Sequence, residues 1–420
     1  MRIRPEHVIS TLKKHILADG FHIVADMDKS HDAYIIDSVT GKEYLDCYSQ
    51  FASQPLGWNH PSLLKRADRF SKAIFNKIAN SDMYTQEYAE FVDTFADITP
   101  DFSNFFFIEG GTLAVENALK AAFNWKGHLL SQDVPGMDWP DALSWFSPQF
   151  DVIHFEKAFH GRSGYCMSLT NTGHIKTGLY PKFEWTRLPL DINVNDLRER
   201  VARATKRDTV AAAIVEPIQA EGGDIHLSKE IFQELRALAN EYRFLLIFDE
   251  IQTGMGFTGK WWCYEHFNVI PDMICFGKKT QVCGFCATDD IKTGTSVFDV
   301  SGRINSTWGG NLMDMIRATL FIEIIKEENL IQNAANIGEF FFKKLLEFQD
   351  KYITNVRGRG LMLAFDLPNR EERDKMFSGL VQHGMLPLKC GDRTIRFRPH
   401  LTFNRDNVEH AVSIIRKTLA

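Results

Sequence analysis

Two adjacent lysines follow an apolar stretch of the chain. Residues 271–277 run from a proline through apolar side chains to a glycine, and Lys278 and Lys279 come next. A lysine is usually a solvated charge, but this stretch is too apolar for a surface edge. Burial lowers the pKa of a lysine from about 10.4, because desolvation disfavours the ammonium. A neutral amine forms and exchanges an imine readily, and the pattern leaves open which of the two lysines does so.

A carboxylate ends a second apolar stretch upstream of the lysines. Residues 244–248 predict a short buried strand, and Asp249 follows it. An unpaired carboxylate there is costly, so we expect a partner. A pyridinium N–H is a suitable one, since the ion pair strengthens the ring as an electron sink; the alternative is an Asp that caps the next turn. We therefore hypothesise that one of these lysines, Lys278 or Lys279, is the Schiff-base lysine of a pyridoxal 5′-phosphate enzyme.

A third stretch has the pattern of an anion site. Residues 105–108 predict a buried strand, residues 109–112 read Glu-Gly-Gly-Thr, and residues 113–123 have a helical pattern. Free backbone N–H groups and the helix dipole at such a helix N-terminus favour a phosphate. An ordinary tight turn between a strand and a helix has the same pattern, so this stretch alone does not establish a phosphate site.

The elements that must position these residues alternate along the chain. A helix expected at 229–242 is one of those that separate the predicted strands. This alternation predicts a mostly parallel sheet, and ligands of such sheets lie beyond the carboxyl ends of the strands. Besides the strands named above, we predict strands at 152–155 and 209–215, a hairpin at 33–48 and a surface excursion at 127–150.

The character of the chain changes after residue 310. Long helices are predicted at 311–328 and 332–350, and then a smaller α/β unit with strands at 359–365 and 394–398 and helices at 371–383 and 405–419. We therefore expect an N-terminal segment, 1–60, that packs with a C-terminal small domain, 311–420, and a large cofactor-binding domain, 61–310.

Composition excludes several classes of protein. The chain has 420 residues, a net charge of −6, 44% hydrophobic and 24% charged residues, as is typical of a globular domain. No basic tract is present, which argues against nucleic acid or an anionic membrane as a partner. No apolar run approaches the roughly 20 residues of a membrane span, and residues 1–7 lack a signal-peptide core. The odd count of seven cysteines indicates a reducing cytoplasm rather than a disulfide framework.

Three other motifs do not support a site. Residues 254–260 have the glycine and lysine spacing of a P-loop, but Trp261 stands where the Mg²⁺-binding Ser or Thr belongs. Cys283 and Cys286 form a CxxC without a second Cys or His pair at zinc spacing. We therefore predict structural cysteines and no metal. The glycine turn at 109–112 does not have the pattern GxGxxG, which argues against a dinucleotide site.

Taken together, these residues resemble the class III aminotransferases of fold type I. The segment 249–256, Asp-Glu-Ile-Gln-Thr-Gly-Met-Gly, followed by the lysine, is the most specific part of the resemblance. Residues 109–112 replace the common Asn-Ser-Gly-Thr-type loop, and Phe257 stands where most members have Arg; both departures fit the branch that acts on lysine. The resemblance implies a large domain with a mostly parallel seven-stranded sheet and a smaller α/β domain. It covers nearly the whole chain, through residues 57–61, 110–112, 159–162, 306–311 and 395–397.

The resemblance also implies pyridoxal 5′-phosphate as cofactor and a homodimer with its active sites at the interface. Lys278, rather than Lys279, would hold the cofactor and move the proton, and Asp249 would pair with the pyridine nitrogen. Gly111 and Thr112 would bind the phosphate. The other implied contacts are Phe159 stacked on the ring, His160 beside it, Gln252 near the ring hydroxyl, and Thr307 reaching the phosphate from the other subunit.

Within this branch, the implied reaction transfers the ε-amino group of L-lysine to 2-oxoglutarate. One site must then accept a neutral methylene and a carboxylate at the same position, and a buried arginine facing the methylene would be costly to leave unpaired. The resemblance implies that Glu221 pairs with Arg396 while lysine reacts and moves away for 2-oxoglutarate, whose distal carboxylate Arg162 holds. The alternatives are another ω-aminotransferase (for ornithine, 4-aminobutyrate or a diamine), an aminomutase or epimerase, and a non-catalytic protein of the same fold.

Overall fold

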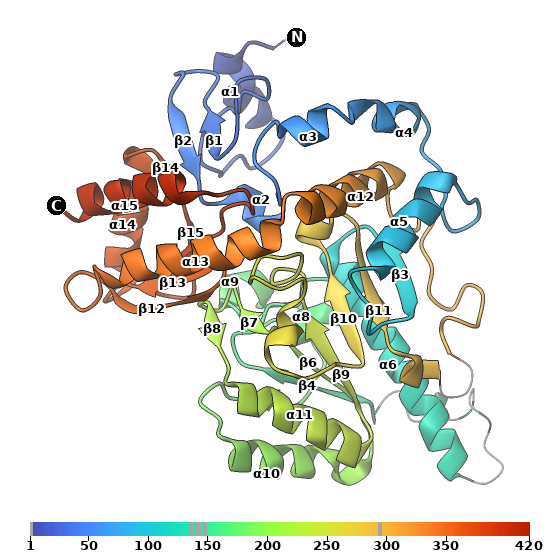
Figure 1. The fold of residues 1–420 in the computed structure, drawn as a ribbon. Coiled ribbons are helices and arrows are strands. Elements are labelled where there is room, and N and C mark those ends of the chain that lie inside the picture. The colour runs from blue at the N-terminus through green and yellow to red at the C-terminus, as the bar shows by residue number, and fades with distance from the viewer. Residues whose placement is uncertain (1–2, 135–137, 139–140, 142–143, 146–148, 293–295) are drawn as a thin grey trace. The chain divides into compact units, whose positions relative to one another are not determined.

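The chain forms two compact units. The computed structural model describes residues 3–134, 138, 141, 144–145, 149–292 and 296–420. One unit comprises residues 68–323, and the other comprises residues 1–67 together with 324–420 (Figure 1). The domain limits expected from the sequence, 1–60, 61–310 and 311–420, remain a prediction. No helix in the described part of the chain is long and apolar enough to cross a membrane.

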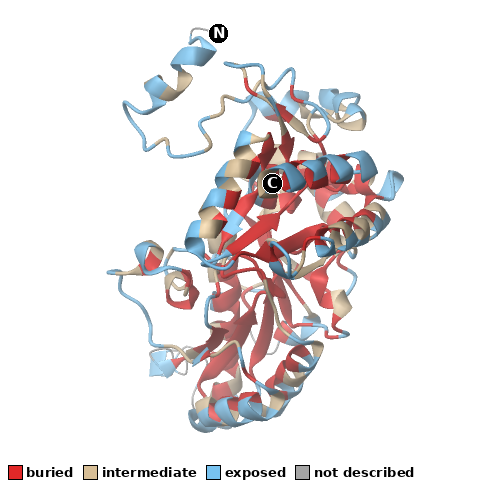
Figure 2. Cartoon of the chain, turned by 90° about the vertical axis from the view of Figure 1, so that its left-hand side faces the viewer, coloured by how far each residue is buried: buried red, intermediate tan, exposed pale blue. Residues whose placement is uncertain are grey.

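A seven-stranded sheet is the centre of the unit 68–323. The strand order is β3-β11-β10-β9-β6-β4-β5. Only β11 runs antiparallel to its neighbours, whereas the remaining pairs are parallel, so the prediction of a mostly parallel sheet is confirmed. The central strands are buried throughout (Figure 2). Their bounds are β3 Asn104–Ile108, β4 Asp151–Phe155, β5 Arg187–Leu188, β6 Val210–Val215, β9 Leu245–Asp249, β10 Met273–Phe276 and β11 Cys283–Ala287.

Helices cover both faces of this sheet because strand side chains alternate between the faces. Along β9, Ile247 joins the apolar cluster under helix α6 (Gly111–Asp133). The next residue, Phe248, packs on Phe232 of helix α11 (Lys229–Tyr242), with ring centres 5.4 Å apart. A strand buried on both faces explains why the sequence of β9 is continuously apolar.

Helix α6 is longer than predicted. The excursion expected at 127–150 begins only after Asp133, and part of it lies outside the described residues. The composition of residues 127–133 does not indicate a helix, because polar contacts rather than apolar side chains bury the last turns of α6. Lys126 Nζ donates to Asp208 Oδ1 at 2.6 Å and to the Arg243 carbonyl at 2.8 Å.

The unit of residues 1–67 and 324–420 has two small sheets. One has the order β1-β2-β14 and the other the order β12-β13-β16-β15. The strand predicted at 359–365 corresponds to β13, but its beginning is wrong: the chain turns at Gly360, which has a left-handed φ of 56°, and a hairpin joins β12 to β13. The bounds are β1 Tyr34–Ile36, β2 Glu43–Asp46, β12 Thr354–Arg359, β13 Met362–Asp366, β14 Met385–Leu386, β15 Leu388–Cys390, β16 Thr394–Phe397, α13 Leu330–Leu346, α14 Arg370–Gln382 and α15 Arg405–Leu419.

The remaining elements are mostly short. Helix α12 (Leu312–Glu327) runs from one unit into the other. The others are α1 Val8–Leu12, α2 Ser49–Ala52, α3 Pro61–Leu64, α4 Ser71–Phe75, α5 Gln86–Ala96, α8 Cys166–Leu169, α9 His174–Thr177, α10 Val194–Ala204, β7 Ile218–Gln219 and β8 Ile225–His226.

Candidate active site

Asp249 and His160 meet beyond the carboxyl ends of the strands. Asp249 ends β9, and His160 follows β4, two places along the sheet. His160 Nδ1 lies 2.8 Å from Asp249 Oδ2, and both side chains are buried. Because an ionised carboxylate only accepts hydrogen bonds, the Nδ1–H of His160 donates. The Ile251 N–H donates to Asp249 Oδ1 at 3.1 Å, so the carboxylate is oriented from two sides.

Lys278 and Lys279 lie on the turn after β10 in different surroundings. Lys279 is 1% exposed, its Nζ is 3.9 Å from the centre of the Phe257 ring, and it donates to the Gln252 carbonyl at 3.3 Å. Lys278 is half-buried and has a left-handed φ of 52°. The Gln281 N–H donates to the Lys278 carbonyl at 2.8 Å. Of the two lysines, Lys278 has the exposure that attachment of a ligand requires.

The N-terminus of α6 forms a cradle. Gly110, with a φ of 101°, turns the chain from β3 into the helix. A Cβ at Gly111 would lie 3.0 Å from Ile251 Cδ1, and one at Gly161 would lie 2.2 Å from Thr112 Oγ1. The first turn of α6 has no acidic side chain. Since the first N–H groups of a helix lack intrahelical acceptors and carry the positive end of its dipole, the cradle suits a phosphate.

Arg162 lies beside this cradle. The neighbouring Ser163 has its Oγ 2.8 Å from Thr112 Oγ1, which ties the loop after β4 to the first turn of α6. Arg162 itself is exposed. An exposed guanidinium next to a phosphate cradle is available to a second anion, such as a substrate carboxylate.

Glu216 is a buried carboxylate that the sequence reasoning left without a role. The Phe159 N–H donates to its Oε1 at 2.9 Å and the Ala220 N–H to its Oε2 at 3.2 Å. Burial raises the pKa of Glu216 to about 7; the charge of Asp249 adds to the rise and that of His160 opposes it. Glu216 directly follows the buried strand β6 and Asp249 ends the buried strand β9, so the same signal in the sequence would have found Glu216.

Glu221 forms an ion pair with Lys176, another residue that the sequence reasoning missed. The pair joins the loop after β6 to α9. Lys176 Nζ is also 6.0 Å from the centre of the Phe159 ring. No sequence signal marks Lys176, because α9 has only four residues and is too short to show a periodic pattern. Lys176 therefore links Glu221 to the neighbourhood of Phe159.

Thr307 lies on a loop whose backbone is tied to the segment before α5. Ser81 Oγ donates to the Thr307 carbonyl at 3.1 Å. The Asn80 N–H donates to the Trp308 carbonyl at 3.2 Å, and its Nδ2 donates to the Gly310 carbonyl at 3.0 Å. Thr307 is exposed. An ordered loop with an exposed threonine suits contact with a second molecule, and that contact stays a prediction.

Arg396 belongs to the other unit. It lies on β16, opposite Ala364 of β13 and Leu388 of β15, and it is 2% exposed. Its pairing with Glu221 stays a prediction.

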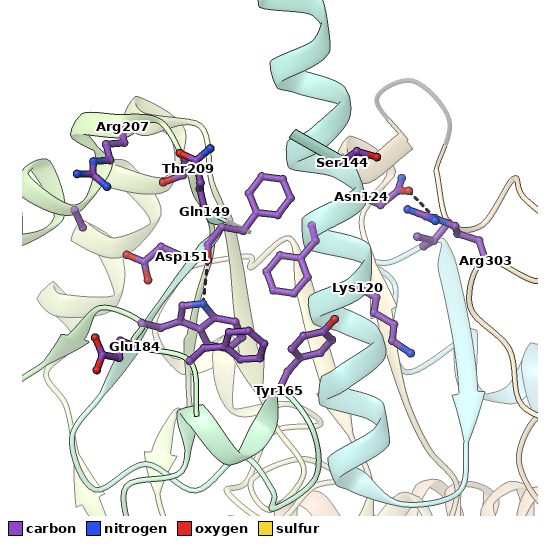
Figure 3. A pocket seen from close by; sticks show the side chains of 16 residues that line it. Lys120, Asn124, Ser144, Gln149, Asp151, Tyr165, Glu184, Arg207, Thr209 and Arg303 are labelled. Atoms are coloured by element: carbon purple, nitrogen blue, oxygen red, sulfur yellow. Dashed lines mark hydrogen bonds between the residues drawn. The ribbon is translucent and has the colours of Figure 1, made fainter. Parts of the chain in front are cut away.

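A cavity of about 1010 Å³ lies at the amino ends of the strands, opposite the candidate site (Figure 3). Its lining includes Asp151, which begins β4, and Thr209, which precedes β6. Figure 3 shows these residues across from Lys120 and Asn124 of α6. Since the residues discussed above follow the carboxyl ends of the strands, this cavity is separate from the candidate site.

A family comparison agrees with this geometry. The model of the family "Aminotransferase class-III" matches residues 17–419. The chain is a class III aminotransferase. It is 41% identical to the L-lysine-epsilon aminotransferase of Mycobacterium tuberculosis, over 99% of this chain and 96% of that protein. It is likewise 41% identical to the enzyme of that name from Amycolatopsis lactamdurans, over 98% and 95% of the two chains.

More distant relatives and solved structures extend the comparison. The 4-aminobutyrate aminotransferase of Kluyveromyces lactis is 33% identical to this class III aminotransferase, over 95% of this chain and 90% of that protein. A solved structure described as "Lysine aminotransferase from M. tuberculosis in the internal aldimine form" matches with a TM-score of 0.91 and 39% identity, and 99% of each chain is covered. The predicted fold is therefore confirmed.

As a class III aminotransferase, the protein transfers amino groups with pyridoxal 5′-phosphate as its cofactor. The residues present fit this group. The cradle at Gly111 suits its phosphate, and the oriented carboxylate of Asp249 suits its pyridinium N–H. Lys278, on the turn after the neighbouring strand β10, supplies an amine. When bound, the cofactor supplies a ring that stabilises negative charge on the substrate carbon.

Proposed function

We propose that this enzyme transfers the ε-amino group of L-lysine to 2-oxoglutarate. The products are L-glutamate and 2-aminoadipate 6-semialdehyde, which cyclises to piperideine-6-carboxylate. The observation that carries the proposal is the full-length similarity to proteins named L-lysine-epsilon aminotransferase, which exceeds the similarity to 4-aminobutyrate aminotransferases.

We assign the proton transfer to Lys278 and the support of the ring to residues that follow the neighbouring strands. With the cofactor bound, Lys278 Nζ would take the proton from the substrate carbon and move it across the cofactor. Asp249 holds the proton on the pyridine nitrogen, and His160 keeps the carboxylate oriented through the 2.8 Å hydrogen bond. Phe159 would stack on the ring. Gln252 would face the ring hydroxyl, and Gly111 and Thr112 would hold the phosphate.

The substrate site must serve two different half-reactions. We propose that Glu221 neutralises Arg396 while the side-chain methylene of lysine lies there, and leaves Arg396 when the α-carboxylate of 2-oxoglutarate arrives. Arg162 holds the distal carboxylate in both halves. The Glu221→Ala variant should then lose lysine turnover far more than glutamate turnover, because Arg396 would face the methylene without a partner. Equal loss in both half-reactions would contradict the proposed movement of Glu221.

We further propose a homodimer in which Thr307 of one subunit reaches the cofactor phosphate of the other. The exposure of Thr307 and the ordered backbone of its loop support this assignment. We also propose the cytoplasm as the compartment, which the seven free cysteines support.

A panel of amino donors with 2-oxoglutarate as acceptor tests the proposed reaction. L-lysine, L-ornithine, 4-aminobutyrate and a diamine are compared by the glutamate that each produces. We expect the highest kcat/KM with L-lysine and a product that cyclises. Because a relative named 4-aminobutyrate aminotransferase is 33% identical, that donor is the strongest competitor, and a higher kcat/KM with it would replace the proposal. Turnover of lysine without 2-oxoglutarate would instead indicate an aminomutase.

A further inference from the structure

Lys176 lies beside two residues of the site described above. It is in an ion pair with Glu221, and its Nζ is 6.0 Å from the centre of the Phe159 ring. The two paired side chains are 37% and 27% exposed, respectively. The pair is therefore partly shielded from water, where an opposite charge matters more than it does on an open surface.

The backbone around the pair holds the two charges together. The Asn171 N–H donates to the Ala158 carbonyl at 2.8 Å, so the segment that leads to α9 is tied to the loop that carries Phe159. A Cβ at Gly222 would lie 2.3 Å from the Lys157 carbonyl oxygen, so the residue after Glu221 packs on the same loop. Lys176 and Glu221 thus approach each other from two segments that rest on one common loop.

The proposed movement of Glu221 changes the partner of a negative charge. When Glu221 leaves Arg396, its charge needs a second partner, because an uncompensated carboxylate in a partly buried site is costly. We infer that Lys176 is that partner and is therefore a specificity-determining residue of this enzyme. Lys176 favours the 2-oxoglutarate half-reaction because it holds Glu221 away from Arg396. This inference rests on the proposed function.

The inference predicts opposite effects for the two members of the pair. Loss of Glu221 leaves Arg396 facing the methylene of lysine and so weakens the lysine half-reaction. Loss of Lys176 leaves Glu221 with Arg396 as its cationic partner, and the carboxylate then competes with the incoming α-carboxylate of 2-oxoglutarate. A merely structural role of Lys176 would weaken both half-reactions alike.

The test uses the holoenzyme and its Lys176→Met variant. The two half-reactions are followed separately by the absorbance of the cofactor, with L-lysine added to the aldehyde form and 2-oxoglutarate to the amine form. Binding of glutarate, a dicarboxylate without a keto group, gives a readout that needs no turnover. We expect the apparent Kd for 2-oxoglutarate and for glutarate to rise about fivefold, the scale of one partly exposed ion pair, with the lysine half-reaction unchanged.

Three further variants complete the design. Lys176→Arg keeps the charge and should restore the affinity, and Lys182→Met removes an exposed lysine from the same segment and should change neither half-reaction. In a Glu221→Gln background, Lys176→Met should have no further effect, because the two residues act as a pair. A persistent effect there, an unchanged affinity for 2-oxoglutarate in Lys176→Met, or equal loss in both half-reactions would overturn the inference.

The two proposals fail separately. If the wild type ignores L-lysine but still converts 2-oxoglutarate and glutamate, the proposed amino donor is wrong, and the effect of Lys176→Met on 2-oxoglutarate still decides the role of Lys176. If the wild type uses L-lysine and 2-oxoglutarate but Lys176→Met leaves the affinity for 2-oxoglutarate unchanged, only the role of Lys176 is wrong.

Discussion

At the scale of single residues, burial is what distinguishes the two adjacent lysines. Lys279 is one of the largest fully buried side chains among the described residues, and its ammonium faces the Phe257 ring and the Gln252 carbonyl. A desolvated cation over an aromatic ring is stabilised by about 2 kcal/mol. Lys279 therefore supports the turn on which Lys278 lies, and the half-buried Lys278 is the residue that we assign to the cofactor.

Substitution of each lysine tests this assignment. Lys278→Ala should abolish the cofactor absorbance that borohydride bleaches and should lower kcat by about 10²–10⁴, the usual contribution of a positioned proton carrier. Lys279→Met should keep that absorbance and lower the melting temperature, because a buried cation and its partners are lost. If the absorbance survives in Lys278→Ala and disappears in Lys279→Met, the assignment is reversed.

Glu216 makes the stability of the protein depend on pH. Burial raises its pKa from an ordinary value of 4.5 to about 7 in the folded protein. A raised folded-state pKa means that the folded state binds the proton more tightly than the unfolded state does. The corresponding stabilisation is fully present below about pH 4.5 and is lost as the pH rises through about 7.

The isosteric Glu216→Gln variant removes this dependence. The free energy of unfolding of the wild type, relative to the variant, should fall by roughly 1–3 kcal/mol between pH 4.5 and pH 7.5. Chemical denaturation at several pH values measures the difference, and Glu6→Gln, at an exposed position, gives the background. A difference that is constant over this range would contradict the raised pKa.

At the scale of elements, the close approach of one loop shapes the phosphate cradle. Gly161 has a φ of 112°, a region that L-residues avoid. Its Cα lies so close to Thr112 that there is no room for a Cβ. Ser163, two residues later, is hydrogen-bonded to Thr112. The loop after β4 and the first turn of α6 thus form one unit, although they are far apart in the sequence.

Gly161→Ala should separate this loop from the helix. The added Cβ would meet Thr112 Oγ1 at 2.2 Å, so we expect a loss of cofactor affinity and about 1–3 kcal/mol of stability. The measurements are the Kd of the cofactor and the melting temperature. Gly302→Ala is the matched control, because Gly302 also has a positive φ but has open space around it. Similar losses of cofactor affinity in both variants would assign the effect to backbone strain alone.

At the scale of the whole molecule, exposed apolar side chains support the proposed dimer. In the unit 68–323, the segment before α5 exposes Phe75 (84%), Met83 (65%) and Tyr84 (79%). The backbone of the Thr307 loop is tied to this segment through Ser81. Exposed apolar residues that gather on one segment are typical of a protein–protein interface. The same surface would then bury these side chains and carry Thr307 to the second subunit.

Complementation between two weakened variants tests the shared site. If Thr307 serves the partner's cofactor, a mixed dimer of Lys278→Ala and Thr307→Ala has one site with both substitutions and one site with neither. Random mixing should therefore restore about a quarter of the wild-type activity, since half of the dimers are mixed and each has one intact site. Mixtures that stay as weak as their parents would place Thr307 in the site of its own subunit.

Much of the large unit could be predicted from the sequence because its signals are local. The helix at 229–242 coincides with α11, and the apolar runs before Asp249 and Lys278 correspond to β9 and β10. Two errors have a common cause. The end of α6 and the hairpin at Gly360 depend on contacts or backbone angles that composition does not reveal.

The sequence by itself determined the fold class, the family and the short list of chemical residues, because apolar periodicity and motif spacing are local properties of a chain. Only the tertiary structure decided how these residues are paired. It joined His160 to Asp249, buried Lys279, and added Glu216 and Lys176 to the site. The physical reason is that the pKa, the exposure and the partner of a charge depend on what folding brings near it, and residues far apart along the chain supply those neighbours.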